Sequence, residues 1–109
     1  MANRWRGEVE IEIDGRPHVM RLTLGALCEL EDRLEDGSVV ALVERFEKGT
    51  VRARDILALL GAGLRGAGVE ISDADLARRE IGGGPVAAMR LAAELLRVTF
   101  MLPGEDGRG

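Results

Sequence analysis

The chain has 109 residues, 46% hydrophobic and 31% charged, with a formal net charge of −4 at pH 7. This length fits one domain, the hydrophobic content is too high for a disordered chain, and no apolar run approaches the roughly 18 residues of a membrane-spanning helix. Because the chain is acidic and has one Trp, two Phe and no Tyr, it lacks the basic groove with stacking rings that nucleic-acid binding requires. Nucleic acid and membranes are therefore not expected partners.

The N-terminal residues and the cysteine content predict a cytoplasmic protein. The opening "MANRWRGEVE" lacks the apolar core of a secretory signal. The single cysteine, Cys28, cannot form an internal disulfide. It lies among apolar positions of a predicted helix and has no cluster of basic residues beside it, so we expect a small core residue.

Residues 4–24 alternate between apolar and charged side chains, which predicts a β-hairpin with one wet side. The dipeptide at Asp14 and Gly15 is a favoured two-residue turn, and it places Glu8 opposite Arg21 as a cross-strand ion pair. The same register brings the apolar side chains to one face, with three facing pairs: Ile11 with His18, Val9 with Met20, and Trp5 with Leu24.

The spacing of apolar residues becomes helical beyond the hairpin. Ser38 and Ser72 can cap the helices that follow them, and Pro85 suits the first turn of the last helix. Gly37 and Gly49 suit the left-handed residue that ends a helix. These signals predict helices at 24–36, 39–48, 51–64, 73–81 and 85–102.

The predicted fold is a single small α+β domain in which an N-terminal β-hairpin is followed by four or five α-helices. The domain is expected to span residues 1–102, and the polar residues 103–109 are expected to form a flexible tail. The hairpin should pack against the first and third helices through Val9, Ile11, Met20 and Leu22.

Gly61, Gly63 and Gly66 have the G-x-G-x-x-G spacing of a dinucleotide-binding loop. Such a loop follows a strand and opens a helix, whereas the "RDILALL" before these glycines has helical spacing. The "VEI" that follows is too short for the helix of a βαβ unit. We therefore interpret Ala58, Gly61 and Ala62 as positions of close helix approach and the "GAG" as a break in the chain, and nucleotide binding stays the alternative.

No cluster of residues predicts catalysis. His18, the only histidine, lies on the hairpin with no nucleophile near it in the sequence, which favours a half-buried structural role. Helical spacing spreads the acidic residues of the first helix around a solvated face rather than into a metal site. These acidic residues are Glu29, Glu31, Asp32, Glu35 and Asp36. No hydrolase, kinase or metalloprotease motif is present, so we expect no enzyme, no cofactor and no metal.

The predicted last helix is apolar over most of its circumference. Its polar residues Arg90, Glu94 and Arg97 form one narrow stripe. One interpretation is a central helix packed by the hairpin and the other helices. The other is a partner-binding surface, which self-association would cover when the partner is absent, so that a homo-oligomer is expected. From amphipathicity alone, the candidate partner-binding residues are Met89, Leu96, Phe100 and Met101.

Residues 2 to about 101 resemble a family of small phage-type tail proteins that are encoded in the tail gene clusters of gene transfer agents. The family is commonly classed as tail assembly chaperones and sometimes labelled tail tube proteins. The resemblance is carried by the segments "ANRWRGEVE", "LTLGALCELE", "ARDILALLGAGLRGAG", "SDADLA" and "AAELLRVTF".

This resemblance implies a non-enzymatic protein that binds the long tape-measure protein while the tail tube polymerises around it, and that then leaves. The tail tube protein is a further candidate partner. The alternative that the resemblance leaves open is a structural tail component. A structural subunit is expected to contain many strands that extend from one subunit to the next, and only about 20 residues of this chain have strand spacing.

Overall fold

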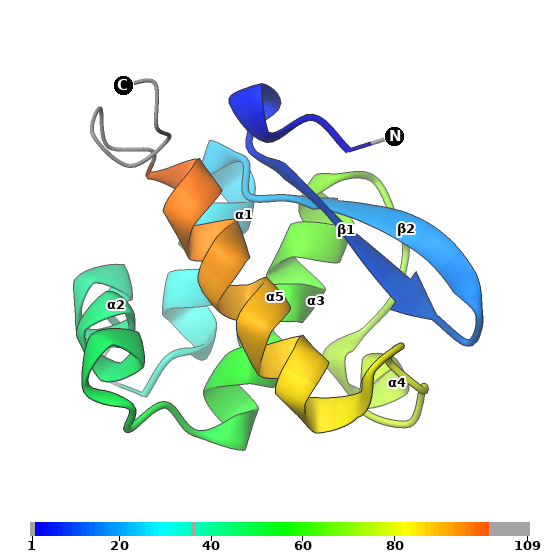
Figure 1. Ribbon diagram of the computed structural model, residues 1–109. Helices are drawn as coiled ribbons and strands as arrows, with labels where there is room; N and C mark the ends of the chain where they lie inside the picture. The colour runs from blue at the N-terminus through cyan, green and yellow to red at the C-terminus, as the bar shows by residue number, and fades with distance from the viewer. Residues whose placement is uncertain (1, 36, 101–109) are drawn as a thin grey trace.

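The computed structural model describes residues 2–35 and 37–100. Two strands at the N-terminus form an antiparallel hairpin, and helices make up most of the rest (Figure 1). In chain order the elements are the 3-10 helix η1 (Arg4–Arg6), β1 (Glu8–Ile13), β2 (Arg16–Arg21), α1 (Leu24–Arg33), α2 (Val39–Lys48), α3 (Ala53–Gly66), α4 (Asp73–Leu76) and α5 (Gly84–Thr99). The predicted α+β fold is confirmed.

The hairpin has the predicted register. The turn residues Asp14 and Gly15 have φ angles of 53° and 80°, which is the left-handed geometry that a tight two-residue turn requires. The facing pairs include Val9 with Met20, Ile11 with His18, and Glu8 with Arg21. A local turn signal and a two-residue period were therefore enough to align the two strands.

The predicted strand begins too early, and Trp5 is not a core residue. The Asn3 side chain accepts a hydrogen bond from the Trp5 N–H, and Gly7 ends the short helix with a φ of 77°, so residues 4–6 coil before the strand starts. Trp5 is consequently 70% exposed, and Leu24, its predicted partner, is the exposed first residue of α1.

The predicted ion pair between Glu8 and Arg21 is also absent. The Glu8 carboxylate instead accepts a hydrogen bond from the Asn3 backbone N–H at 2.9 Å, and one of its oxygens lies 3.9 Å from Nε of Arg6. The coiled residues before β1 therefore supply the partners of Glu8, although Arg21 stands opposite it in the register.

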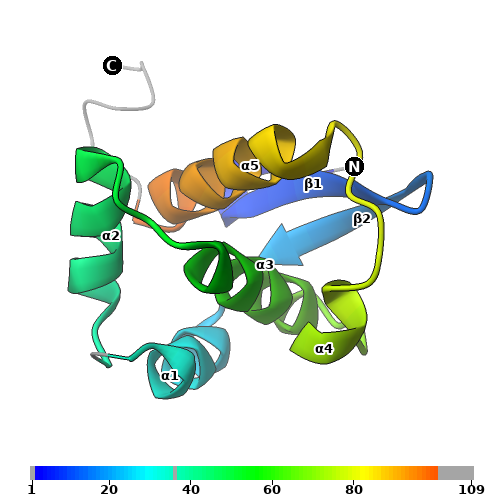
Figure 2. The ribbon, with the colours of Figure 1, turned by 90° about the horizontal axis from the view of Figure 1, so that it is seen from below.

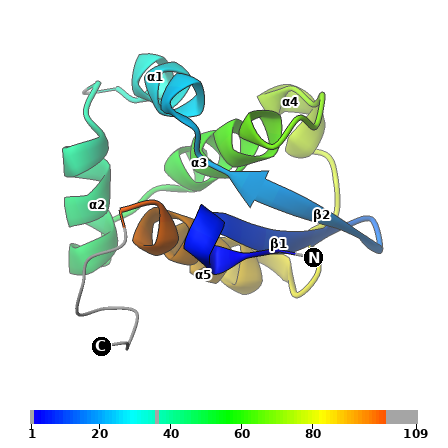
Figure 3. The same ribbon diagram turned by 90° about the horizontal axis from the view of Figure 1, so that it is seen from above.

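One face of the hairpin packs on two helices, with α5 against β1 and α3 against β2 (Figure 2). Helix α1 packs on α3, and α2 stands at one end of the molecule, crossing the direction of α3 (Figure 3). The expectation that the first helix would cover the hairpin is therefore wrong, because α5 takes that place. The largest fully buried apolar side chains are Ile11, Met20, Leu30, Leu42, Leu59, Leu64 and Leu95.

The predicted helix caps are confirmed at three positions. Ser38 and Ser72 each accept a hydrogen bond from a backbone N–H three residues later, and Gly49 ends α2 in a left-handed conformation. The fourth helix is shorter than predicted, because α4 ends at Leu76. The last helix begins one residue before the predicted Pro85 and ends at Thr99 rather than near residue 102.

Gly61, Gly63 and Gly66 all lie inside α3, and each allows a close contact with a different element. A Cβ atom at Gly61 would lie 2.1 Å from Oδ1 of Asp73, and one at Gly63 would lie 2.6 Å from Cδ2 of Leu95. At Gly66 the Cβ atom would lie 2.1 Å from the backbone oxygen of Arg21. The close approach expected at Gly61 is confirmed, and the structure adds the contacts at Gly63 and Gly66, since α3 continues to Gly66.

The contact at Gly66 leads to a stability prediction. The Gly66→Ala substitution should lower the free energy of unfolding by about 1–3 kcal/mol, because the new methyl group meets backbone of β2 that cannot rotate away. Urea denaturation measures this loss. Gly25→Ala in α1 is the matched control, since no atom lies within 4 Å of its Cβ position, and helix propensity alone predicts a gain of up to about 1 kcal/mol there. A gain at both positions would show that α3 and β2 are not in close contact.

Candidate interaction surface

The one histidine and the one cysteine of the chain lie on different elements, His18 on β2 and Cys28 on α1. His18 is half-buried on β2, and its Nδ1 lies 3.0 Å from the backbone oxygen of Arg16, as expected of a structural histidine. Cys28 is exposed, so its assignment to the core is wrong. Helix α1 packs chiefly on α3, which buries Ala26 and Leu30 and leaves Cys28 on the outer side.

The acidic residues of α1 divide into a solvated group and a paired group. Glu31 and Asp32 are exposed, as predicted, whereas Asp36 lies outside the described residues. Glu29 lies within 2.8 Å of Nε of Arg65 on α3, and Glu35 accepts a hydrogen bond from Arg52 at 2.8 Å. These two ion pairs therefore connect α1 and the residues after it to α3 and the residue before it.

A four-residue charge network joins α1, α3 and α4. Asp73, the first residue of α4, pairs with Arg33 of α1 and lies 3.0 Å from Nη2 of Arg65. Glu29 contacts the same two arginines. Gly61 leaves room for the Asp73 carboxylate directly on the backbone of α3. The network contains two positive and two negative charges, so its charges already balance without a bound ion. This arrangement is suited to joining three helices.

A second ionic cluster holds the beginning of α3. Asp55 is 2% exposed and accepts hydrogen bonds from the Arg52 backbone N–H at 3.0 Å and from Nε of Arg45 at 3.1 Å. Burial acts to raise the pKa of the Asp55 carboxyl, but the backbone hydrogen bond and the Arg45 guanidinium outweigh it and bring the pKa below its ordinary value. The ionised carboxylate therefore links α2 to α3.

The four candidate partner-binding residues have different positions. Met89 is 42% exposed and Phe100 is 44% exposed, so both are available on the surface of α5. Leu96 is only 5% exposed and belongs to the core, which removes it from the candidate surface. Met101 lies outside the described residues. The last helix thus has a buried side and an exposed side, and partner binding stays a prediction.

The exposed side of α5 carries an apolar stripe, which we define as Val86, Met89, Ala93 and Phe100. Residues three and four apart lie on one side of a helix, and the first three follow that spacing within α5. Phe100 comes seven residues after Ala93 and directly follows the last residue of the helix. Val86 is 69% exposed, and Ala93 is partly exposed between the larger side chains. Val86 was not among the residues predicted from the sequence, although its helical spacing from Met89 and Ala93 indicates that the three lie on one side of the helix.

Two exposed arginines follow one edge of the apolar stripe. Arg90 and Arg97 are two helical turns apart and form no ion pair within residues 2–35 and 37–100. Glu94 lies between them on the same polar stripe, four residues after Arg90 and three before Arg97, but forms no ion pair with either arginine in the described residues. It lines a shallow depression with residues of η1 and β1.

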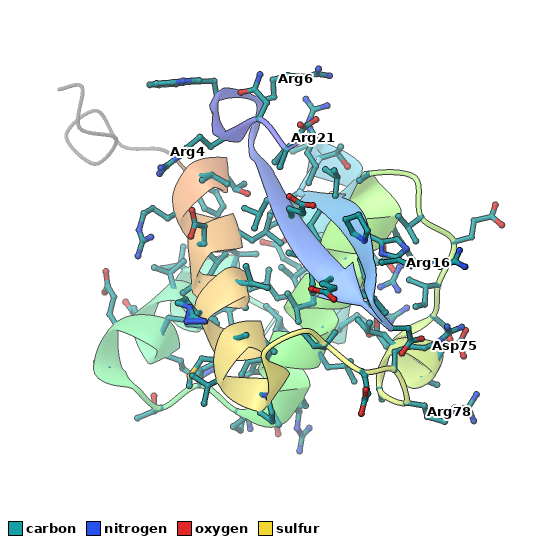
Figure 4. All side chains as sticks on the ribbon, turned by 45° about the vertical axis from the view of Figure 1, so that its right-hand side comes forward. Arg4, Arg6, Arg16, Arg21, Asp75 and Arg78 are labelled. Atoms are coloured by element: carbon teal, nitrogen blue, oxygen red, sulfur yellow. The ribbon has the colours of Figure 1, made fainter. Side chains whose placement is uncertain are left out.

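Other exposed charges surround the hairpin and α4. In Figure 4, Arg4 and Arg6 project from η1, and Arg16 and Arg21 lie at opposite ends of β2. Asp75 lies in α4, and Arg78 lies two residues after its end. The Asp14 carboxylate at the hairpin turn accepts hydrogen bonds from the Glu80 backbone N–H and from Arg79, which lower its pKa. These contacts join the turn of the hairpin to the segment that precedes α5.

The structure also bears on two other kinds of site. In the part of the chain that the structure describes, no three His, Cys, Asp or Glu side chains are grouped as metal ligands. None of the described helices combines the length and hydropathy of a membrane span.

The fold and the stripe on α5 define a small α+β domain with one partly apolar helical surface. The family model described as "Phage tail tube protein, GTA-gp10" matches residues 6–102, so the chain belongs to this family. It is therefore a phage-like tail-cluster protein of the gene transfer agent type, in agreement with the resemblance of its sequence segments. Comparisons with curated proteins and with solved structures found no match.

Proposed function

We propose that this protein is a non-enzymatic tail assembly chaperone that binds the tape-measure protein before the tail tube encloses it. The observation that carries the proposal is the apolar stripe, which leaves Val86 and Met89 exposed on α5 and Phe100 exposed directly after it. A tape-measure protein presents long amphipathic stripes before assembly, and a helix with an exposed apolar side can cover such a stripe reversibly.

A structural tail component is the second candidate, and the description of the family favours it equally. A tube subunit needs strands that continue from one subunit into the next. Within residues 2–35 and 37–100, the strands are β1 and β2 of six residues each, paired with one another. This small sheet supports the chaperone proposal, because helices supply most of the surface.

The composition of finished particles tests the two candidates. We expect that the protein co-purifies with the tape-measure protein when both are expressed together, and that purified particles lack it, because a chaperone leaves when the tube closes. Quantitative mass spectrometry of particles makes the measurement, with the major tail tube subunit as the internal reference. Detection in amounts equal to that subunit would replace the chaperone proposal with the structural one.

A further inference from the structure

We infer that the apolar stripe of α5 and its arginine edge bind an amphipathic helix that has acidic residues along one side of its own apolar stripe. This inference rests on the proposed function and specifies the chemistry of the partner segment. The apolar contact is provided by Val86, Met89 and Phe100, and the charge selection by Arg90 and Arg97.

The charge complementarity follows from the two unpaired arginines. Arg90 and Arg97 are exposed and lie along the same edge of the stripe, two turns apart. A helix packed on the stripe would bring its flanking residues beside these guanidinium groups. Carboxylates at that edge would form two ion pairs next to an apolar contact, whereas lysines there would be repelled.

The same geometry argues against a second copy of α5 as the occupant. If two copies pack antiparallel about a two-fold axis, symmetry places both arginine edges on the same side of the interface, where four arginines meet only two Glu94 side chains and leave an excess of positive charge. If they pack parallel, each arginine edge faces the opposite edge of the other helix, which carries Pro85 and the buried Leu96 and no carboxylate. Neither arrangement supplies a carboxylate for each arginine.

The first test uses the full chain and the tape-measure protein from the same gene cluster. The double variant Arg90→Glu and Arg97→Glu should weaken binding about tenfold in isothermal titration, since two attractive contacts become repulsive. Arg16→Glu is the matched control: Arg16 is also exposed and without an ion pair, and it lies on β2, beyond β1 from α5 (Figure 4). Equal losses for both variants would overturn the inference.

The second test separates this inference from the proposed function. Two synthetic amphipathic helices share one leucine stripe and carry either glutamate or lysine along one edge. The unmodified chain should prefer the glutamate peptide by about tenfold, and the double variant should prefer the lysine peptide. Equal binding of both peptides, or binding of neither, overturns the inference whatever the tape-measure protein does.

Self-association is the remaining outcome. If the unmodified chain forms a dimer that Phe100→Glu dissociates, the apolar stripe is an interface between two copies and the inference is overturned. Circular dichroism should show that every variant is folded, because the substituted side chains are all exposed. If the unmodified chain does not bind the tape-measure protein, that result contradicts the proposed function but not this inference. The inference is tested separately by the preference of the apolar stripe for the glutamate peptide.

Discussion

The Ile11→Asp variant is expected to be unfolded, with the free energy of unfolding lowered by at least about 4 kcal/mol. Ile11 is among the largest fully buried side chains, on the face of the hairpin that packs on α3 and α5. A carboxylate placed there would lose its hydration inside the buried apolar cluster, and the facing residue of β2 is the half-buried His18. Since small domains are stable by about 5–15 kcal/mol in total, a loss of this size removes most of the stability.

Urea denaturation followed by circular dichroism measures the effect of Ile11→Asp. The control is Val40→Asp, which makes the same kind of change at a β-branched residue that is mostly exposed on α2. Its effect should stay within about 0.5 kcal/mol. An unchanged denaturation midpoint for Ile11→Asp would show that Ile11 does not face the core, and the hairpin register would then have to be revised.

The second large effect is expected at Asp55. Asp55→Ala should lower the free energy of unfolding by about 2–4 kcal/mol, because it removes the backbone hydrogen bond that begins α3 and leaves the Arg45 guanidinium without this carboxylate. Thermal or urea unfolding measures the loss. Asp32→Ala, on the exposed side of α1, should change stability by no more than about 0.5 kcal/mol. Equal effects at the two positions would contradict the role of the buried cluster.

The Asp55 carboxylate also predicts a dependence of stability on pH. Its pKa in the folded protein is lower than in the unfolded chain, so the ionised form stabilises the fold above about pH 4. That contribution is lost as the pH falls through the folded pKa. Between neutral and strongly acidic pH, the unmodified protein should therefore lose more stability than the Asp55→Asn variant. Parallel pH profiles for the two proteins would refute this assignment.

The candidate surface was predictable only in part. Amphipathicity shows that α5 has more apolar residues than one core-facing side needs, and Met89 and Phe100 are indeed exposed. It does not show which apolar residues face outward, because that depends on where α3 and the hairpin lie around the helix. Leu96 was therefore chosen in error as a surface residue, and Val86 was missed.

The long-range pairs that Glu29, Arg33, Arg65 and Asp73 form between helices had no signal in the sequence, although Glu29 and Arg33 have the i,i+4 spacing of a helical pair. Arg33 and Asp73 are 40 residues apart, and no periodicity links them. Any of the arginines could have paired with any of the many carboxylates of this charged chain. The pairs are chosen by the packing of α1 and α4 on α3, which brings these particular side chains within reach.

By itself, the sequence determined the hairpin register, the caps at Ser38 and Ser72, and the helical location of the G-x-G-x-x-G glycines. Each of these depends on hydrogen bonds or side-chain spacing within a few residues, so a local pattern suffices. Only the tertiary structure decided which elements cover the hairpin, what contacts Gly61, Gly63 and Gly66, and which side of α5 faces solvent. These features arise where segments distant in the chain compete for the same buried surface, and local spacing does not decide that competition.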